Sequence, residues 1–155
     1  MKNIFNYAIV VVFLICSVTG CGSKVLKTDY VEGTVTYKGE PVITASLAFS
    51  PVKAGEGHPA YGITDKSGIY KIQTFLGAPD KGTTPGEYIV TVSKSIGVPT
   101  GQFGIDPEGN RIEFMNAKSV LPLNYRDTAT SPLRATVTSG GPNKFDFELV
   151  GEPPK

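Results

Sequence analysis

The sequence predicts an all-β fold, a sandwich of two sheets built from seven short strands. Apolar residues recur at every second position over several short segments, as they do when one face of a strand is buried. Turn-forming residues separate these segments, since the 155 residues include 18 Gly and 12 Pro but no Trp. No segment beyond residue 21 has the 3.6-residue repeat of a helix. Contents of 40% hydrophobic and 19% charged residues are typical of one globular domain.

Residues 1–20 are expected to be a signal peptide and not part of the fold. Lys2 gives a positive start, and an unbroken apolar run follows from Ala8 to Cys16. A helix of this length rises only about 13 Å, far less than the roughly 30 Å hydrocarbon core of a membrane. A charged start, a short apolar centre and small residues before a cleavage site are typical of secretory signals.

The end of this segment, Ser17-Val18-Thr19-Gly20-Cys21, resembles the bacterial lipobox. The resemblance implies cleavage between Gly20 and Cys21 and fatty acyl chains such as palmitate on Cys21. The other cysteine, Cys16, lies in the part removed, so the mature chain can form no internal disulfide. Two or three acyl chains, at about 0.8 kcal/mol per buried methylene, would anchor the protein firmly. An ordinary signal peptide with an incidental cysteine is the alternative.

The charge balance excludes nucleic acid as an expected partner. The chain has 15 basic and 14 acidic residues, and removal of Lys2 with the signal peptide makes the two numbers equal. A neutral chain offers no basic field for a nucleic acid and no polybasic run for an anionic membrane surface. Gly22 replaces the Asp associated with inner-membrane retention, which favours the outer membrane or the periplasmic face.

After a tether at residues 21–29, the sandwich is expected to span residues 30–150. The first strand runs from Tyr30 to Tyr37, with alternate residues facing the core. The second carries Ala45, Leu47 and Phe49, and Pro51 ends it because proline lacks a ladder donor. A Gly- and Pro-containing loop follows and holds the single histidine, His58.

The third and fourth strands are predicted to form a hairpin, with Tyr61 and Ile63 and then Tyr70 and Ile72 in the core. The turn between them is Asp65-Lys66-Ser67-Gly68, in which Gly68 is expected at positive φ. The fifth strand, Tyr88 to Ser93, is expected to be central. Its first residue resembles the corner tyrosine of Ig-like sandwiches, whose hydroxyl bonds back to nearby backbone.

Several Gly and Pro residues interrupt the strand pattern over residues 96–119, which we interpret as a long loop. Arg111 to Phe114 alternate briefly beside a turn at Asp106 to Asn110, so the loop has room for a small hairpin. A loop of this length inside a compact domain is commonly functional or mobile. Two aromatic rings, a guanidinium and a thioether are of the types enriched in interfaces, so Phe103, Arg111, Phe114 and Met115 are the expected partner-binding residues.

Two further strands complete the predicted sandwich. Leu133, Ala135 and Val137 carry the sixth strand, and Gly140 to Asn143 form the next turn. Phe145, Phe147 and Leu149 carry the seventh strand, and residues 151–155 form a tail.

Five segments of the chain, taken in their order along the sequence, resemble bacterial lipoproteins with a carboxypeptidase regulatory-like domain. They are Val31–Val35, Gly39–Val42, Gly62–Tyr70, Pro85–Val92 and the ending from Leu121 to Leu149. The likeness covers residues 30–150 apart from 96–119. It implies a transthyretin-like sandwich at the cell surface. The family has no common chemistry, and the resemblance does not imply peptidase activity.

The residues give little support to an enzyme or a metal site. A hydrolase would need His58 beside a nucleophile and an acid, and the chain lacks a Gly-x-Ser-x-Gly elbow. The Asp65–Gly68 turn resembles half a calcium loop, yet it lacks the further Asp and the closing Glu that calcium requires. No catalytic residue, metal or cofactor is therefore expected.

We interpret the chain as an exported, membrane-anchored β-sandwich module with a non-catalytic binding or structural role at the cell envelope. Its expected partners are the membrane, through acyl chains on Cys21, and an envelope protein or glycan. The alternatives are a carbohydrate-binding module, which would use exposed aromatic residues such as Phe75 or Phe103, and a hydrolase using His58.

Overall fold

The computed structural model describes residues 26–76 and 81–155, so Gly20 and Cys21 lie outside the described residues. This part of the chain is all β and contains no α-helix, only one short 3-10 helix. The elements are β1 Val31–Tyr37, β2 Glu40–Pro41, β3 Ser46–Pro51, β4 Ala60–Ile63, β5 Ile69–Lys71, β6 Gln73–Thr74, β7 Gly86–Ser93, β8 Ser95–Ile105, β9 Arg111–Ser119, η2 Leu123–Tyr125, β10 Arg134–Val137, β11 Asn143–Lys144 and β12 Phe147–Leu149. The twelve strands of the described residues exceed the predicted seven for three reasons: the predicted fourth and seventh strands are each divided in two (β5 and β6, β11 and β12), the predicted first turn contains β2, and residues 96–119 add two strands.

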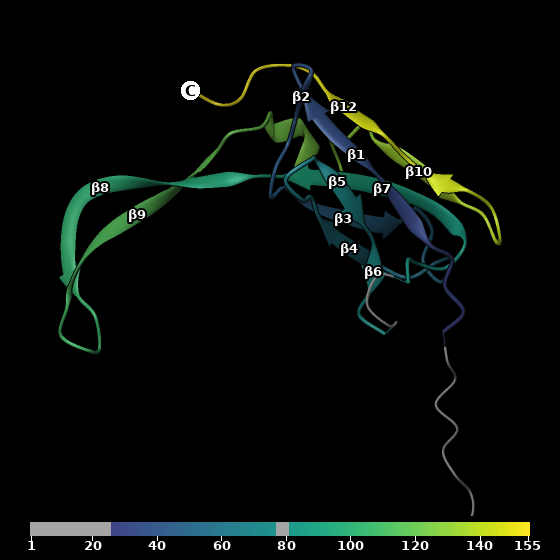
Figure 1. The fold of residues 1–155 in the computed structure, drawn as a ribbon, viewed down its shortest axis with the longest axis horizontal. Helices are drawn as coiled ribbons and strands as arrows, with labels where there is room; N and C mark the ends of the chain where they lie inside the picture. The colour runs from purple at the N-terminus through teal and green to yellow at the C-terminus, as the bar shows by residue number, and fades with distance from the viewer. Residues whose placement is uncertain (1–25, 77–80) are drawn as a thin grey trace, which may run out of the picture.

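Two five-stranded sheets form a sandwich (Figure 1). In one sheet the strand order is β10-β7-β3-β4-β6, and in the other β1 lies at the centre and pairs with β2, β5, β11 and β12. The rings of Phe49, from the first sheet, and Tyr70, from the second, lie 6.2 Å apart at their centroids. The core between the sheets is built from Val31, Val35, Val42, Ala45, Leu47, Phe49, Ala60, Tyr70, Ile72, Tyr88, Val90, Val92, Leu121, Tyr125, Ala135, Val137, Phe147 and Leu149.

Most of the predicted strands and their inward faces are confirmed. β1 buries Val31, Gly33 and Val35 in alternation, and β3 ends at Pro51 as expected. β7 lies between β3 and β10 and is therefore an interior strand. The predicted sixth strand is β10, which buries Ala135 and Val137.

The predicted inward face of the third strand is wrong. Ala60 and Gly62 of β4 are buried, whereas Tyr61 is half-buried and Ile63 is 62% exposed. The reason is space, because a Cβ on Gly62 would stand 2.5 Å from the Lys71 carbonyl oxygen and 2.9 Å from the Ile72 side chain. Large side chains from β5 and its continuation already fill this part of the core, so β4 must turn its small residues inward.

The predicted hairpin at residues 60–74 is divided between the two sheets. β4 pairs with β3 and, at its first two residues, with β6, while β5 pairs with β1. The turn itself is confirmed, because Gly68 has φ 74° and its N–H bonds the carbonyl of Asp65 at 3.1 Å. The carbonyl of Gly68 accepts from Val35 at 2.9 Å and so ties the turn to β1.

The predicted seventh strand is two short strands, β11 and β12, and both run parallel to β1. Between them the side chain of Asp146 replaces the backbone as the partner of β1, accepting from the N–H and hydroxyl of Thr34 at 2.9 and 2.8 Å. The Thr34 hydroxyl lowers the pKa of Asp146 below its usual value. Burial raises the pKa of Tyr70, whose hydroxyl therefore stays protonated and donates to the Phe145 carbonyl at 2.6 Å.

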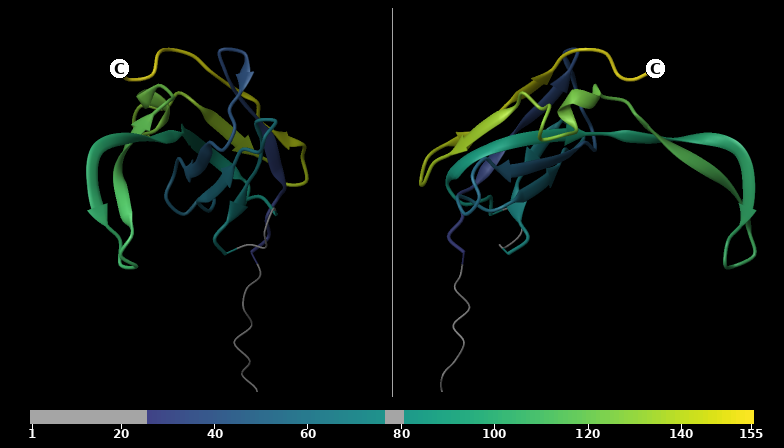
Figure 2. Two further views of the ribbon diagram at one scale, coloured as in Figure 1. Left: turned by 60° about the vertical axis from the view of Figure 1, so that its left-hand side comes forward. Right: turned by 180° about the vertical axis from the view of Figure 1, so that it is seen from behind.

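The sequence suggested that residues 96–119 form a long loop. This prediction is wrong, because these residues form most of a long antiparallel hairpin. Strands β8 and β9 pair from Ser95 and Ser119 at the base to Ile105 and Arg111 near the tip. Together they form a separate two-stranded sheet that curves away from the sandwich, as the views from the front and from behind both show (Figures 1 and 2). We call residues 95–119 the arm.

Candidate functional site: the arm

Local hydrogen bonds build the tip of the arm, and the sequence placed its turn correctly. The N–H of Gly109 donates to the carbonyl of Asp106, whose carboxylate accepts from the Asn110 backbone at 2.7 Å and from its side-chain amide at 3.0 Å. The Asn110 amide lowers the pKa of Asp106. The charged form of Asp106 therefore stabilises the turn, which should weaken only when strong acid protonates this carboxyl group.

A bulge divides the arm into a base and a tip, because the register shifts between Pro99 and Phe103. Side chains repair the interrupted ladder: the Thr100 hydroxyl donates to the Phe114 carbonyl at 2.9 Å, and a Glu113 carboxylate oxygen accepts from Gly101 at 2.9 Å. Proline has no N–H to offer and bulges twist an edge, so Pro99 and the bulge hinder further strands from pairing with β8. The faces of the arm are therefore more accessible for binding than this edge.

The structure separates the four predicted binding residues onto two faces. Opposite residues in a ladder share a face, and Phe103 pairs with Glu113 while Pro99 pairs with Met115. Alternation then places Phe103, Arg111 and Met115 on one face. The Arg111 guanidinium lies 4.1 Å from the centre of the Phe103 ring, a cation–π contact. Phe114 lies on the opposite face, where its ring covers Gly104.

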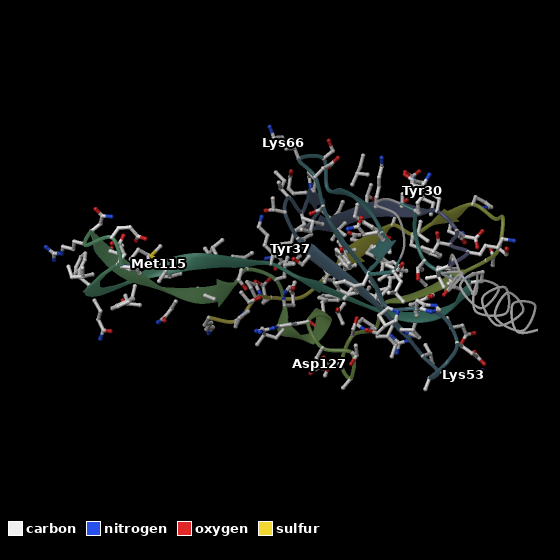
Figure 3. The ribbon with its side chains drawn as sticks, turned by 90° about the horizontal axis from the view of Figure 1, so that it is seen from below. Tyr30, Tyr37, Lys53, Lys66, Met115 and Asp127 are labelled. Atoms are coloured by element: carbon white, nitrogen blue, oxygen red, sulfur yellow. The ribbon has the colours of Figure 1, made fainter. Side chains whose placement is uncertain are left out.

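The arm exposes apolar side chains on both faces. Phe103, Phe114 and Met115 are each about half exposed, and Ile105 is 70% exposed. Figure 3 shows Met115 on the arm, well away from Tyr30 and Tyr37 of the sandwich. None of the core residues belongs to the arm. A two-stranded hairpin alone is marginally stable in water, so a surface that packs against the arm would stabilise it.

His58 contacts hydroxyl and backbone groups, not a carboxylate. Its Nδ1 lies 3.3 Å from the Thr84 hydroxyl, its carbonyl accepts from the Thr83 hydroxyl at 2.8 Å, and its N–H donates to the Tyr88 hydroxyl at 3.2 Å. The Tyr88 hydroxyl donates to the Thr84 carbonyl at 2.7 Å. This bond to nearby backbone is the one expected of a corner tyrosine. Together with the bond from the His58 N–H, it connects the His58 loop to the start of β7. Within the described ranges, no hydrogen bond or ion pair joins His58 to an acidic side chain.

The Asp65 turn uses its carboxylate for backbone hydrogen bonds. Oδ1 accepts from the N–H groups of Ser67 and Ile69 at 2.8 and 3.0 Å, as in an Asx turn. In residues 26–76 and 81–155, no three His, Cys, Asp or Glu side chains gather where they could hold a metal ion. The same residues include no helix with the length and hydrophobicity needed to cross a membrane.

Sequence reasoning missed a second surface feature, an open cleft of about 380 Å³ on the outer side of β4 and β5. Its lining includes Tyr61, Ile63, Asp65, Ile69, Lys71 and Gln73. Phe75, named from the sequence only as an exposed ring, packs against Tyr61 in a tilted arrangement, with 4.5 Å between ring centroids. The alternation at residues 61–63 was a signal for this surface, but it was assigned to the core.

Comparisons with known proteins do not establish a family. No family model and no curated protein matches the chain. Among solved structures it is similar to a 9R-lipoxygenase from Cyanothece PCC8801, with a TM-score of 0.35 and 12% identity. That likeness covers 79% of this chain but 16% of the lipoxygenase chain, and at this TM-score it carries no functional argument.

Proposed function

We propose that the protein is a lipid-anchored, non-catalytic binding module of the cell envelope, and that its arm holds the partner. The observation that carries the proposal is the arm itself: a hairpin that leaves the sandwich and exposes rings and aliphatic side chains on both faces. Contiguous exposed apolar surface marks interaction sites in folded proteins. The bulge and Pro99 favour binding through a face rather than by strand addition to β8.

The sequence supports the lipid anchor and the place of the arm as an insertion in the sandwich. The lipobox resemblance supports acylation of Cys21 after cleavage behind Gly20, with the domain held at the outer membrane or the periplasmic face. The pieces that resemble carboxypeptidase regulatory-like domains fall on the sandwich, and the arm interrupts them. A shared scaffold commonly carries an individual function on such an insertion. The partner is an envelope protein or glycan, and no cofactor or catalytic residue takes part.

Changing Cys21 to Ser is expected to abolish membrane attachment, because it removes the one thiol that remains after cleavage. Detergent-phase partitioning of the expressed full chain measures this. The wild type should enter the detergent phase, and the Cys21→Ser chain should be uncleaved or soluble. Equal partitioning of processed wild-type and Cys21→Ser chains would show that the anchor is not on Cys21.

Replacing residues 96–119 with a short Gly-Ser link is expected to leave the sandwich folded but to abolish partner capture. Folding should survive because no core residue lies in the arm and the Val120 N–H bonds the Lys94 carbonyl at its base. Melting curves and crosslinked pull-downs from the native envelope measure both properties. Two paired variants, Phe103→Ser with Met115→Ser and Ile112→Ser with Phe114→Ser, identify the binding face.

A matched control is Leu123→Ser, because Leu123 is an equally exposed apolar residue on the sandwich side of the molecule. This variant should capture the partner like the wild type, whereas one paired variant should reduce capture at least tenfold. Capture by the shortened chain at the wild-type level would place the binding surface elsewhere. Unfolding of the shortened chain would show that the arm is needed for the fold.

A further inference from the structure

We infer that the outer face of β4, β5 and β6 is a saccharide-binding site, separate from the arm. Because Ala60 and Gly62 face the core, Tyr61 and Ile63 lie on the outside of the sandwich. Tyr61 pairs with Gln73 across the β4–β6 ladder, and the Phe75 ring, directly after β6, packs against the Tyr61 ring. The face thus gathers aromatic, aliphatic and polar side chains from three strands.

The Tyr61 ring lines the cleft, and the Phe75 ring, just outside the lining, packs against it. The ring centroids of Tyr61 and Phe75 lie 4.5 Å apart at an interplanar angle of 34°, and Phe75 is 78% exposed. The side-chain amide of Gln73 donates to the Tyr61 hydroxyl at 2.8 Å, which fixes the orientation of the Tyr61 ring. A large ring that packs on another ring and is still mostly exposed offers a stiff apolar platform at little entropic cost to the ligand.

Polar groups border the cleft next to this platform. The Lys71 ammonium forms no ion pair with any described residue, so it can donate to a ligand. Asp65 uses Oδ1 for the turn, and its Oδ2 accepts no hydrogen bond from the described residues. Ile63 and Ile69 add apolar surface to the lining. Donors and acceptors therefore alternate with apolar surface over a short distance.

This mixture fits a pyranose better than a wholly apolar ligand or a highly charged one. A pyranose with equatorial substituents has an apolar C–H face for a ring and a rim of hydroxyl groups for Lys71 and Asp65. The cleft, at about 380 Å³, is within the range of about 300–1,000 Å³ for small-ligand sites. The cleft is open to solvent, so a ligand can extend beyond it as a chain. The expected ligand is therefore a glycan of pyranose units with equatorial substituents.

The test is a calorimetric titration of the full chain, in detergent, with chitotetraose and with cellotetraose. We expect at least one of these tetrasaccharides to bind. Phe75→Ala should weaken that binding about tenfold, and Lys71→Met should weaken it several-fold without lowering the melting temperature. Both side chains are exposed, so neither change disturbs the core. Leu123→Ala is the matched control, because it removes an exposed apolar side chain that lies outside both the arm and this face, and it should bind as the wild type does.

Two results would overturn the inference. One is that neither tetrasaccharide binds at millimolar concentration, and the other is that Phe75→Ala and Leu123→Ala bind equally well. If neither sugar binds while Phe75→Ala reduces capture of an envelope protein, this face is a protein contact and the saccharide assignment is wrong. The titration uses soluble sugars and an intact arm. Its failure is therefore distinguishable from failure of the anchor or of the arm.

Discussion

Gly33→Ala is expected to destabilise the domain by about 3 kcal/mol or more and to lower its Tm by on the order of 10 °C. A Cβ at this position would stand 1.8 Å from the carbonyl oxygen of Phe145 and 2.8 Å from the Tyr70 hydroxyl. The first contact is with backbone, so β1 and the segment between β11 and β12 must separate. Separation also strains the 2.6 Å hydrogen bond from Tyr70 to Phe145.

Circular dichroism melting of the full chain measures this loss. Gly97→Ala is the matched control, because Gly97 also lies in a strand at ordinary φ but its added Cβ would meet the flexible Met115 side chain at 3.3 Å. The control should melt within a few degrees of the wild type. A Gly33→Ala chain that melts with this control would mean that β1 and the last strands do not approach as closely as described.

Tyr88→Phe is expected to cost about 1 to 3 kcal/mol, although it removes a single oxygen atom. The Tyr88 side chain is fully buried, and its hydroxyl lies 2.7 Å from the Thr84 carbonyl and 3.2 Å from the His58 N–H. A phenylalanine keeps the packing against Phe49, with ring centroids 5.9 Å apart, but leaves these backbone groups without their partner. The His58 loop should consequently detach before the sheets melt.

Amide hydrogen exchange at His58, compared with amides of β3, measures this selective loosening. Tyr30→Phe is the control, because the Tyr30 hydroxyl bonds Glu32 on the exposed surface. That change should leave both stability and exchange nearly unaltered. If Tyr88→Phe matches the control in both measurements, the corner tyrosine does not hold the loop.

Local patterns in the sequence were enough to predict the fold class and several single residues. Alternation along β1, β3, β7 and β10 identifies strands with one buried face, because the side-chain period of two belongs to the backbone itself. The turn before Gly68 and the Asp106 turn depend on groups within five residues of one another, so they too could be predicted. Tyr88 bonds four residues upstream and was predictable for the same reason.

The tertiary structure alone decided which apolar face of β4 is buried, because Tyr61 with Ile63 and Ala60 with Gly62 both alternate. The choice depends on the volume left by Ile72, and a shift of one residue reverses every side chain of a strand. The length of the arm and the pairing of its two strands also could not be predicted. Its Gly and Pro residues interrupt the strand pattern in the sequence. In the structure, the side chains of Thr100 and Glu113 bond to backbone groups on the opposite strand where the ladder is interrupted.

The parallel pairing of β1 with β11 and β12 depended most on the tertiary structure, because it joins residues more than 100 positions apart. Gly33 is an ordinary strand glycine in the sequence. Its function becomes clear only where the Phe145 carbonyl occupies the space of its missing side chain. Periodicity determined the strands of this protein, whereas their partners, their buried faces and hence the binding surfaces depended on packing between distant segments.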